Sequence, residues 1–599
     1  MTIMNNNKIY KWLSGVMMTA VLAAGITACT DDHFDVNSEV TGRGTLWENI
    51  KANSSLSEYA DILQSTSYSQ TEGSSTVQTY ADIFNGDATY TVWAPTNGTF
   101  DYSTWKSLLA DGTYASKYKV EKELIRNNMT RFTHVMTGND QYDLDLFNDK
   151  TAIFDCANAT FAGKSITTSN IGATNGVLHV INGNAEYQPN LYEYMATRSD
   201  LDSLNTFIKS YENIEFDENN STQGPTIDGE ITWVDSVTYT SNDYFQTIGY
   251  LNREDSLYAM IMPTNSAWEK ALAKTKKYYN YMSTYEQNVV TVSSDGTETT
   301  SKYTTSFSDL ELDSLINMYS KSAICSNLSF NANYQYYPFD KYNPGNVDSL
   351  RTVSYNILRQ KEMDLPSLFD GVQPIELSNG YAYVVDNFNF PSSTWATEKE
   401  IEAERTSNIE KTQRCTLTQT KISLTAKNYP NYPDMSVSED TIISLTVART
   451  VQTSSSANPV VTFIIPRTLS CKYDIYALMA YNSDANLPNQ FRASITYHDG
   501  TKPGTTSQNL TVPADDAIHG SGNNFQTIAQ HIDETTGKCV YVDSVCLARD
   551  FEFPVCYAGL ENAYVTITLT SYVSSSQTKN FSREMWIDKL YLKAKDDAE

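Results

Sequence analysis

The sequence predicts a multidomain protein in which two α+β domains are followed by an antiparallel β-sandwich of the jelly-roll type. The chain of 599 residues is too long for a single hydrophobic core. One strand-to-helix segment occurs twice, and the last third consists of short strand-like runs separated by turn residues. The predicted boundaries are a leader at 1–28, an acidic segment at 29–42, α+β domains at 43–190 and 191–395, a linker at 396–412 and the sandwich at 413–599.

The composition indicates a folded protein and excludes some classes of function. Hydrophobic residues make up 40% of the chain and charged residues 19%. The 71 acidic residues outnumber the 43 basic ones, so we expect no nucleic-acid partner, because phosphate binding needs a concentrated basic surface. The six histidines are scattered, and there is no HExxH, GxSxG, GxGxxG or Walker motif. We therefore predict no catalytic residue, no metal site and no cofactor.

The amino terminus has the features of an export signal. Lys8 and Lys11 precede the apolar run WLSGVMMTAVLAAGI, which is short for a permanent membrane span. The run ends in ITAC, which resembles a bacterial lipobox and predicts lipidation of Cys29. The following TDDHFD resembles the surface-export signal of lipoproteins of Bacteroidetes. An ordinary secretory signal and a plain acidic linker are the alternatives.

The repeated segment reads YTVWAPTNGTF at 90–100 and YAMIMPTNSAW at 258–268. Each copy has a strand-like run that ends at a proline, which cannot donate to a strand ladder. We expect Thr96 and Asn97 to cap the helix that follows in the first copy, and Ser266 with Glu269 to form a capping box in the second. Each copy has an Asn-Gly pair downstream, which predicts a hairpin turn with both residues at its centre.

Two landmarks in each copy resemble the fasciclin (FAS1) domain, namely the strand into Pro-Thr-Asn and the later Asn-Gly before a strand. The segments at 46–63 and 191–211 resemble the family's opening helix, and FTHVMTG at 132–138 its middle segment. The resemblance covers residues 43–395 and implies two FAS1 domains, in which His134 braces a loop and does not react. The motif residues are Pro95, Thr96, Asn97, His134, Asn175 and Gly176 in the first copy and Pro263, Thr264, Asn265, Asn379 and Gly380 in the second.

The second copy contains additional polar and aromatic segments. TVSSDGTETTSKY at 291–303 predicts a polar hairpin or loop. KKYYNYMSTY at 276–285 and NYQYYPFDKYNP at 333–344 are rich in tyrosine, which suits sugar or peptide ligands because the side chain has an apolar face and a polar edge. Packing of these segments against their own domain is the alternative. The candidate ligand-binding residues are Tyr278, Tyr279, Tyr281, Tyr334, Tyr336, Tyr337 and Tyr342.

Two further residue classes concern modification. Asp followed by Ser or Thr and an aliphatic residue resembles the O-glycosylation site of the same bacteria. Seven cysteines remain after Cys29, without a CxxC pair, so disulfides and free buried thiols are both open. The glycosylation candidates are Ser203, Ser236, Ser256, Ser314, Ser349, Thr441 and Ser544.

The carboxyl-terminal third predicts the sandwich. Runs such as VVTFIIP, FRASITYHD and AYVTITLTSY are strand-like and are separated by Gly, Asn, Asp and Ser. The terminal IDKLYLKA resembles the last strand of galactose-binding-like jelly rolls of bacterial surface proteins. Such a domain would either carry a ligand in its end loops or serve as a spacer or docking domain.

The resemblances imply a function outside the cell. They imply a non-enzymatic lipoprotein on the extracellular face of the outer membrane, which assists a SusC/SusD-type transporter and binds a glycan or a peptide. Adhesion to host matrix or to other cells is the alternative, because FAS1 domains in general resemble adhesion modules. An enzyme acting on glycans would need two carboxylates at a set separation, and no such pair stands out.

Overall fold

A computed structural model describes residues 42–68, 78–219, 221–227, 230–235, 238–293, 297–333, 339–359, 365–388, 398–429, 438–482, 484–528 and 542–595. The chain divides into two compact units, one of Met1–Gln188 with Ile214–Ser241 and one of Pro189–Asn213 with Asn242–Glu599. The predicted leader and Cys29 lie outside the described residues. Within the described part, no helix combines the length and apolar character needed to cross a membrane. The predicted multidomain architecture of helices and sheets is confirmed.

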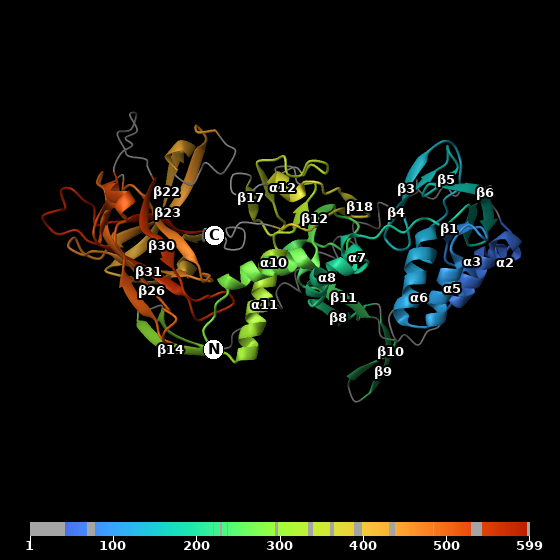
Figure 1. The fold of residues 1–599 in the computed structure, drawn as a ribbon, viewed down its shortest axis with the longest axis horizontal. Coiled ribbons are helices and arrows are strands. Elements are labelled where there is room, and N and C mark those ends of the chain that lie inside the picture. The colour runs from blue at the N-terminus through green and yellow to red at the C-terminus, as the bar shows by residue number, and fades with distance from the viewer. Residues whose placement is uncertain are drawn as a thin grey trace. The chain divides into compact units, whose positions relative to one another are not determined.

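The first repeat is a seven-stranded sheet with helices packed on it (Figure 1). Its strand order is β2-β1-β7-β6-β5-β4-β3, and only β1 and β7 pair in parallel. The helices are α2 (Leu46–Ala52), α3 (Ser57–Ser65), α4 (Tyr80–Asn85), α5 (Tyr102–Asp111) and α6 (Tyr114–Val120). The strands are β1 (Tyr90–Pro95), β2 (Met129–Arg131), β3 (Gln141–Asp145), β4 (Thr151–Asp155), β5 (Thr160–Phe161), β6 (Lys164–Ala173) and β7 (Gly176–Ile181).

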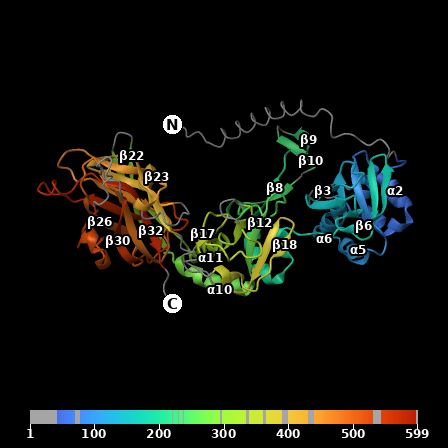
Figure 2. The same ribbon diagram turned by 90° about the horizontal axis from the view of Figure 1, so that it is seen from above.

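The second repeat has a smaller sheet, with the order β15-β12-β19-β18 and β12 parallel to β19. Helices α10 and α11 pack on each other beside it (Figure 2). The helices are α7 (Leu191–Ala196), α8 (Asp202–Lys209), α9 (Phe245–Ile248), α10 (Asn265–Thr275), α11 (Asp309–Cys325) and α12 (Leu365–Phe369). The strands are β12 (Tyr258–Pro263), β15 (Ser329–Asn331), β16 (Ser349–Arg351), β17 (Ile357–Arg359), β18 (Ile375–Leu377) and β19 (Gly380–Val385).

Three pairs of strands and one hairpin are separate from these sheets, and β16 with β17 is the first pair. Strand β8 (Glu212–Phe216) pairs with β11 (Thr238–Asn242), and β9 (Thr222–Ile227) pairs with β10 (Glu230–Asp235). We call β8 to β11 the arm. Strands β13 (Thr284–Val292) and β14 (Glu298–Ser306) form an antiparallel hairpin, which confirms the polar hairpin predicted around 291–303.

The two repeats share one strand register. Tyr90 lies opposite Gly176 and Pro95 opposite Ile181 in the first repeat. In the second repeat, Tyr258 lies opposite Gly380 and Pro263 opposite Val385. A short antiparallel strand borders each pair on the other side, β2 in one case and β15 in the other. The repeated sequence therefore corresponds to a repeated backbone.

The Asn of each Pro-Thr-Asn corner bonds backward, which corrects the predicted capping. The Asn97 side chain accepts the Glu58 N–H of α3 at 2.9 Å, and Asn265 accepts the Ser203 N–H of α8 at 2.8 Å. Helix α5 is capped by Asp101 instead. The capping box expected from Ser266 is also wrong, because α10 already begins at Asn265 and its N-cap, Thr264, makes no side-chain cap bond.

The Asn-Gly pairs lie at hairpin turns as predicted, but only the asparagine lies inside the turn, whereas both residues were expected at its centre. The turns are the two residues before each glycine, and Gly176 and Gly380 are the first residues of β7 and β19. A Cβ on either glycine would lie 1.8 Å from the carbonyl oxygen of the opposite tyrosine, so only glycine fits. Neither Asn175 nor Asn379 has a positive φ.

The carboxyl-terminal sandwich consists of two antiparallel sheets. One has the order β22-β23-β32-β25-β30 with β20 beside β32, and the other β21-β24-β31-β26-β29-β28 with β27 beside β26. Apolar side chains of both sheets share one core, including Phe463, Ile475, Ile567 and Leu590. The strands are β20 (Lys399–Glu402), β21 (Ile409–Gln413), β22 (Cys415–Thr425), β23 (Ile442–Gln452), β24 (Val460–Ile465), β25 (Lys472–Ala480), β26 (Gln490–Tyr497), β27 (Thr506–Asn509), β28 (Gly520–Ser521), β29 (Asn524–Gln526), β30 (Val542–Glu552), β31 (Val565–Ser571) and β32 (Trp586–Ala594).

The linker predicted at 396–412 is wrong, because this segment supplies the first two strands of the sandwich. Strand β20 pairs with β32, and β21 pairs with β24. Two glutamates of this charged segment have a partner in the sandwich, since Lys589 lies 3.0 Å from Glu400 and 3.8 Å from Glu402. The cysteines of the described residues are free and buried, which is one of the two alternatives above: Cys156, Cys325, Cys415, Cys471, Cys546 and Cys556.

Candidate functional site

The tyrosine-rich segment Lys276–Glu286 attaches the second repeat to the sandwich, and we call it the strap. The Tyr281 hydroxyl donates to the Ala558 carbonyl at 2.9 Å, and the Tyr285 hydroxyl donates to the Cys556 carbonyl at 2.8 Å. Backbone bonds reinforce these contacts, including the Cys556 N–H to the Asn280 carbonyl at 2.8 Å. The strap therefore makes the second repeat and the sandwich one compact body.

Of the four predicted ligand-binding tyrosines that the structure describes, three do not form a surface. Tyr278, Tyr279 and Tyr281 are only 8%, 5% and 8% exposed, because they pack against the sandwich. Tyr278 and Tyr281 are thus packing residues, but their partners lie in the sandwich and not in their own domain as the alternative stated, and Tyr279 also lines a cavity. Tyr342 is 72% exposed, with the Lys341 ammonium 4.9 Å from its ring centre. Tyr334, Tyr336 and Tyr337 lie outside the described residues.

A cavity of about 380 Å³ lies where the strap, helix α11 and the sandwich meet. Tyr279 and Tyr319 contribute rings that stack at 6.2 Å between centres. Hydroxyl and amide groups of the second repeat form the adjoining wall: Ser322, Ser326, Asn327, Ser354 and Asn356. The sandwich supplies Leu469, Ala558 and Gly559 together with two cations, Lys399 of β20 and Arg467 of the turn after β24.

The two cations give the cavity its charge. The cavity lining contains no Asp or Glu. Among the described residues, no ion pair joins Lys399 or Arg467 to a carboxylate. Burial lowers the pKa of Lys399, and the charge of Arg467 lowers it further. Burial and the charge of Arg467 both disfavour the charged form of Lys399. Binding of an anion is therefore favourable, because it offsets the two positive charges.

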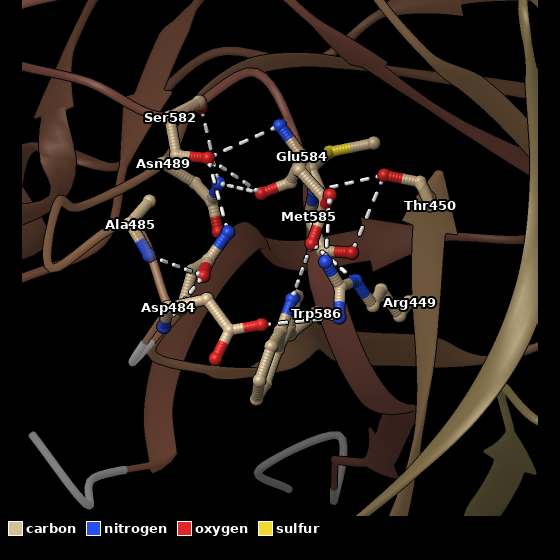
Figure 3. Close-up of polar contacts among 10 residues, drawn as sticks. Arg449, Thr450, Asp484, Ala485, Asn489, Ser582, Glu584, Met585 and Trp586 are labelled. Atoms are coloured by element: carbon tan, nitrogen blue, oxygen red, sulfur yellow. Dashed lines mark hydrogen bonds and ion pairs between the residues drawn. The ribbon is translucent and has the colours of Figure 1, made fainter. Parts of the chain in front are cut away.

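The cluster around Arg449 of β23 shows a paired cation in the same sandwich (Figure 3). Arg449 Nη1 lies 3.1 Å from Asp484 Oδ2, and its Nη2 donates to Glu584 Oε2 at 3.4 Å. The guanidinium carbon lies 5.5 Å from the centre of the Trp586 ring, and the indole N–H donates to Glu584 at 2.9 Å. The cluster ties β23 to β32, and the positive charge of Arg449 is paired within it. It therefore has the features of a structural cluster.

A histidine between two carboxylates forms a second structural cluster. His519 Nδ1 lies 2.6 Å from Asp516 Oδ1, and Nε2 lies 2.9 Å from Asp543 Oδ1. All three side chains are buried. Burial opposes the charge of His519, but Asp543 and Asp516 together raise its pKa above the ordinary value. In the described part of the chain, no group of three or more His, Cys, Asp or Glu side chains is arranged to hold a metal ion.

The loop that contains His134 is braced through backbone groups. The His134 N–H donates to Thr91 Oγ1 at 2.8 Å, and its carbonyl accepts from His179 Nε2 at 3.0 Å. His179 is fully buried in β7, stacks on Trp93, and its pKa is lowered by burial to about 4, so the ring is neutral. Sequence analysis did not single out His179, although a histidine inside an apolar strand was a usable signal.

The glycosylation candidates differ in exposure. Ser314 is exposed on α11, whereas Ser203, Ser256, Ser349, Thr441 and Ser544 are half-buried. Ser236 lies outside the described residues. Of the described candidates, Ser314 therefore offers the best access to a modifying enzyme.

Comparisons with known proteins leave the family open. No family model matches the chain, and no curated protein does. A FAS1 domain pair of the insect cell adhesion molecule fasciclin I is 10% identical, over 58% of this chain and 97% of that chain, with a TM-score of 0.17. A Paenibacillus xanthan lyase is 12% identical over 36% of this chain, with a TM-score of 0.19, and the match spans 16% of the lyase. The CBM22-1–GH10 modules of a Clostridium thermocellum xylanase are 10% identical, over 33% of this chain and 29% of that chain, with a TM-score of 0.18.

Proposed function

We propose that this chain is a non-enzymatic lipoprotein on the outer face of the outer membrane, which binds a glycan or peptide for a SusC/SusD-type transporter. The observation that carries the proposal is the cavity between the second repeat and the sandwich. It combines stacked aromatic rings with hydroxyl, amide and cationic groups, a mixture typical of ligand sites. The lipobox-like sequence at Cys29 supports the anchor, because several acyl chains on one residue hold a protein firmly.

We also propose that the repeats are two FAS1 domains and that the sandwich is a galactose-binding-like module. The shared register of β1 with β7 and of β12 with β19 supports the first assignment. So do Asn97 and Asn265, which make equivalent bonds to an opening helix. The two antiparallel sheets support the second assignment.

Fractionation and affinity purification of the native protein test this function. We expect the wild-type chain in the outer membrane, accessible to antibody on intact cells, and in a complex with a SusC/SusD-like pair. Cys29→Ala should release the protein from the membrane fraction while the fold is kept. Purification without any transporter, together with silent glycan and peptide binding screens, would contradict the proposal. Release of reducing sugar from a polysaccharide panel would contradict its non-enzymatic part.

Adhesion is a second candidate, favoured by the exposed apolar side chains of the arm. Ile214, Phe216, Ile231 and Tyr239 are 78%, 44%, 48% and 49% exposed. Exposed apolar groups that gather on one element are typical of contact surfaces. A deletion strain separates the two functions in the same experiment. Poor growth on one polymer with normal adhesion indicates uptake, and normal growth with lost adhesion indicates the second candidate.

A further inference from the structure

We propose that the cavity binds an acidic sugar, with Lys399 and Arg467 holding its carboxylate and the stacked tyrosines and polar wall holding its ring and hydroxyls. This inference rests on the proposed function and narrows its ligand to a uronate. It concerns only the second repeat and the sandwich, which together form one compact unit.

The first step of the argument is charge. The chain has 71 acidic residues against 43 basic ones, so carboxylates for pairing are abundant. Other shielded cations use them: Lys589 lies 3.0 Å from Glu400, and Arg126 lies 2.5 Å from Glu121. Lys399 and Arg467 instead face one cavity without a carboxylate in its lining. Two like charges in a partly desolvated site destabilise the free protein, and a bound anion removes that cost.

The second step is preorganisation of the turn that carries Arg467. Its backbone has a φ of +56°, in the left-handed region that a residue with a side chain rarely adopts. The turn is held in place, because the Thr468 carbonyl accepts the Tyr557 N–H at 2.8 Å and the Ser470 N–H donates to the Tyr278 carbonyl at 3.0 Å. A strained backbone that neighbouring contacts hold fixed is typical of binding sites.

The third step is the chemistry of the remaining wall. The volume of about 380 Å³ suits a small ligand, since such sites usually measure about 300–1,000 Å³. The hydroxyls and amides of the wall already bond within the protein, as in Ser354 Oγ donating to the Thr247 carbonyl at 2.7 Å. Their oxygens keep acceptor sites for the hydroxyl groups of a sugar, and the rings of Tyr279 and Tyr319 offer it an apolar face. Besides the two rings, the aliphatic residues of the lining are Ala323, Leu469 and Ala558, so the polar and cationic groups dominate the wall. An acidic sugar has a carboxylate for the two cations, hydroxyl groups for the polar wall and an apolar face for the tyrosine rings.

Calorimetric titration of the full-length protein at low salt tests the assignment. The probes are digalacturonate, its neutral counterpart galactobiose and the peptide triglutamate. We expect digalacturonate to bind at least about tenfold more tightly than galactobiose, because hydrogen bonds to a charged group are strong. Lys399→Gln and Arg467→Gln should each weaken this binding about tenfold or more. Lys399→Arg keeps the charge and should retain binding, and Lys593→Gln, on an exposed sandwich lysine, should leave it unchanged.

Two further measurements separate a binding role from a structural role. Thermal unfolding of Lys399→Gln and Arg467→Gln should occur at the wild-type temperature or somewhat above it, because each change removes one of two like charges. Arg449→Gln should lower stability and leave binding unchanged. Binding to the wild type should fall as rising pH removes the proton of Lys399, and Lys399→Arg should abolish that dependence. An arginine stays charged throughout this pH range, so binding by Lys399→Arg should not change with pH. If the side chain at position 399 only supported the fold, the wild type and Lys399→Arg would show the same pH dependence of binding.

The outcomes decide the inference independently of the proposed function. It is overturned if digalacturonate does not bind, if both Gln variants bind it like the wild type, or if triglutamate alone binds with the same dependence on Lys399 and Arg467. If the inference fails while the protein still lies on the cell surface with a transporter, the proposed function stands. If digalacturonate binds as expected but the protein is neither at the surface nor with a transporter, only the proposed function fails.

Discussion

At the scale of single residues, the partners of a charged side chain decide its role in this chain. Arg449 has two carboxylates and an indole ring around it, and His519 has a carboxylate on each ring nitrogen. Lys399 and Arg467 face a cavity without a carboxylate in its lining. Arg449 and His519 therefore stabilise the sandwich, whereas Lys399 and Arg467 favour the binding of an anionic ligand.

His519 should make the stability of the sandwich depend on pH. Its pKa is raised in the folded state, so its charged form contributes stability that is fully present below the unfolded value of about 6.5 and is lost as pH rises through the folded value. We expect His519→Gln to cost about 2 kcal/mol or more at pH 6. The cost should shrink as the pH rises. Hydrogen exchange of β30, followed with pH, measures the difference.

His134→Gln provides the control, because burial lowers the pKa of His134. A histidine whose pKa is lowered on folding stabilises the folded state in its neutral form. The contribution of His134 to the stability of the wild type is therefore lost as the pH falls. The two variants should therefore show opposite pH trends relative to the wild type. A cost of His519→Gln that stays flat or grows with rising pH contradicts the prediction.

The individual residues of the candidate site were also the hardest feature to predict from the sequence. The composition of the strap indicated recognition, yet the burial of Tyr278 and Tyr281 depends on the sandwich, which lies far away in the sequence. Lys399 stood in a segment that was interpreted as a linker, and no local pattern indicates that β20 pairs with β32. Because the cavity assembles from six separate stretches of the chain between Tyr279 and Gly559, no motif in the sequence marks it.

At the scale of elements, the repeated segment predicted strands and turns well and helix caps poorly. The strand ends at Pro95 and Pro263 and the turns before Gly176 and Gly380 follow from local backbone chemistry. The cap expected from Asn97 failed because this side chain bonds to a helix that lies far earlier in the chain. The box expected from Ser266 and Glu269 failed because α10 already begins at Asn265. A side chain with several polar atoms suits both a local and a distant partner, and only the fold decides between them.

Asn175 should be a main stabilising residue of the first repeat. Its side chain accepts the Leu46 N–H at 2.8 Å and donates to the carbonyls of Phe84 and Gly86 at 2.9 and 2.7 Å. Asn175→Ala leaves three polar groups without these bonds, so we expect a loss of about 3 kcal/mol. Hydrogen exchange of β1 and β7, which reports on this unit alone, measures the loss.

Thr174→Ala is the matched control, because Thr174 is an exposed residue of the same turn. We expect this change to stay within about 0.5 kcal/mol of the wild type. Equal exchange rates in the two variants would show that the turn, and not the asparagine side chain, holds the opening helix. Asn379 makes equivalent bonds to Leu191, Leu251 and Arg253, so the same substitution there is expected to act in the second repeat.

At the scale of the whole molecule, a multidomain architecture of helices and sheets was predictable, whereas the attachment of the second repeat to the sandwich was not. Periodicity and turn residues are local properties, and they predicted two α+β regions followed by a sandwich. Such local patterns could not predict the contacts of the strap. Its partners Cys556 and Ala558 lie 271 and 277 residues after Tyr285 and Tyr281 in the sequence. The same attachment forms the cavity, so stability and ligand binding share one interface.

The strap should make the second repeat and the sandwich unfold together. Tyr281→Phe with Tyr285→Phe removes two buried hydroxyls and leaves the carbonyls of Ala558 and Cys556 without these donors. We expect a loss of about 2–3 kcal/mol in the coupling of the two parts, since each hydrogen bond contributes about 1 kcal/mol and its stranded partner adds a penalty. In calorimetry, the single transition expected for this unit should move down in temperature and split. Tyr303→Phe, on an exposed tyrosine of β14, should leave the transition in place. An unchanged transition in the double variant would mean that the apolar faces of the strap, rather than its hydroxyls, hold the two parts together.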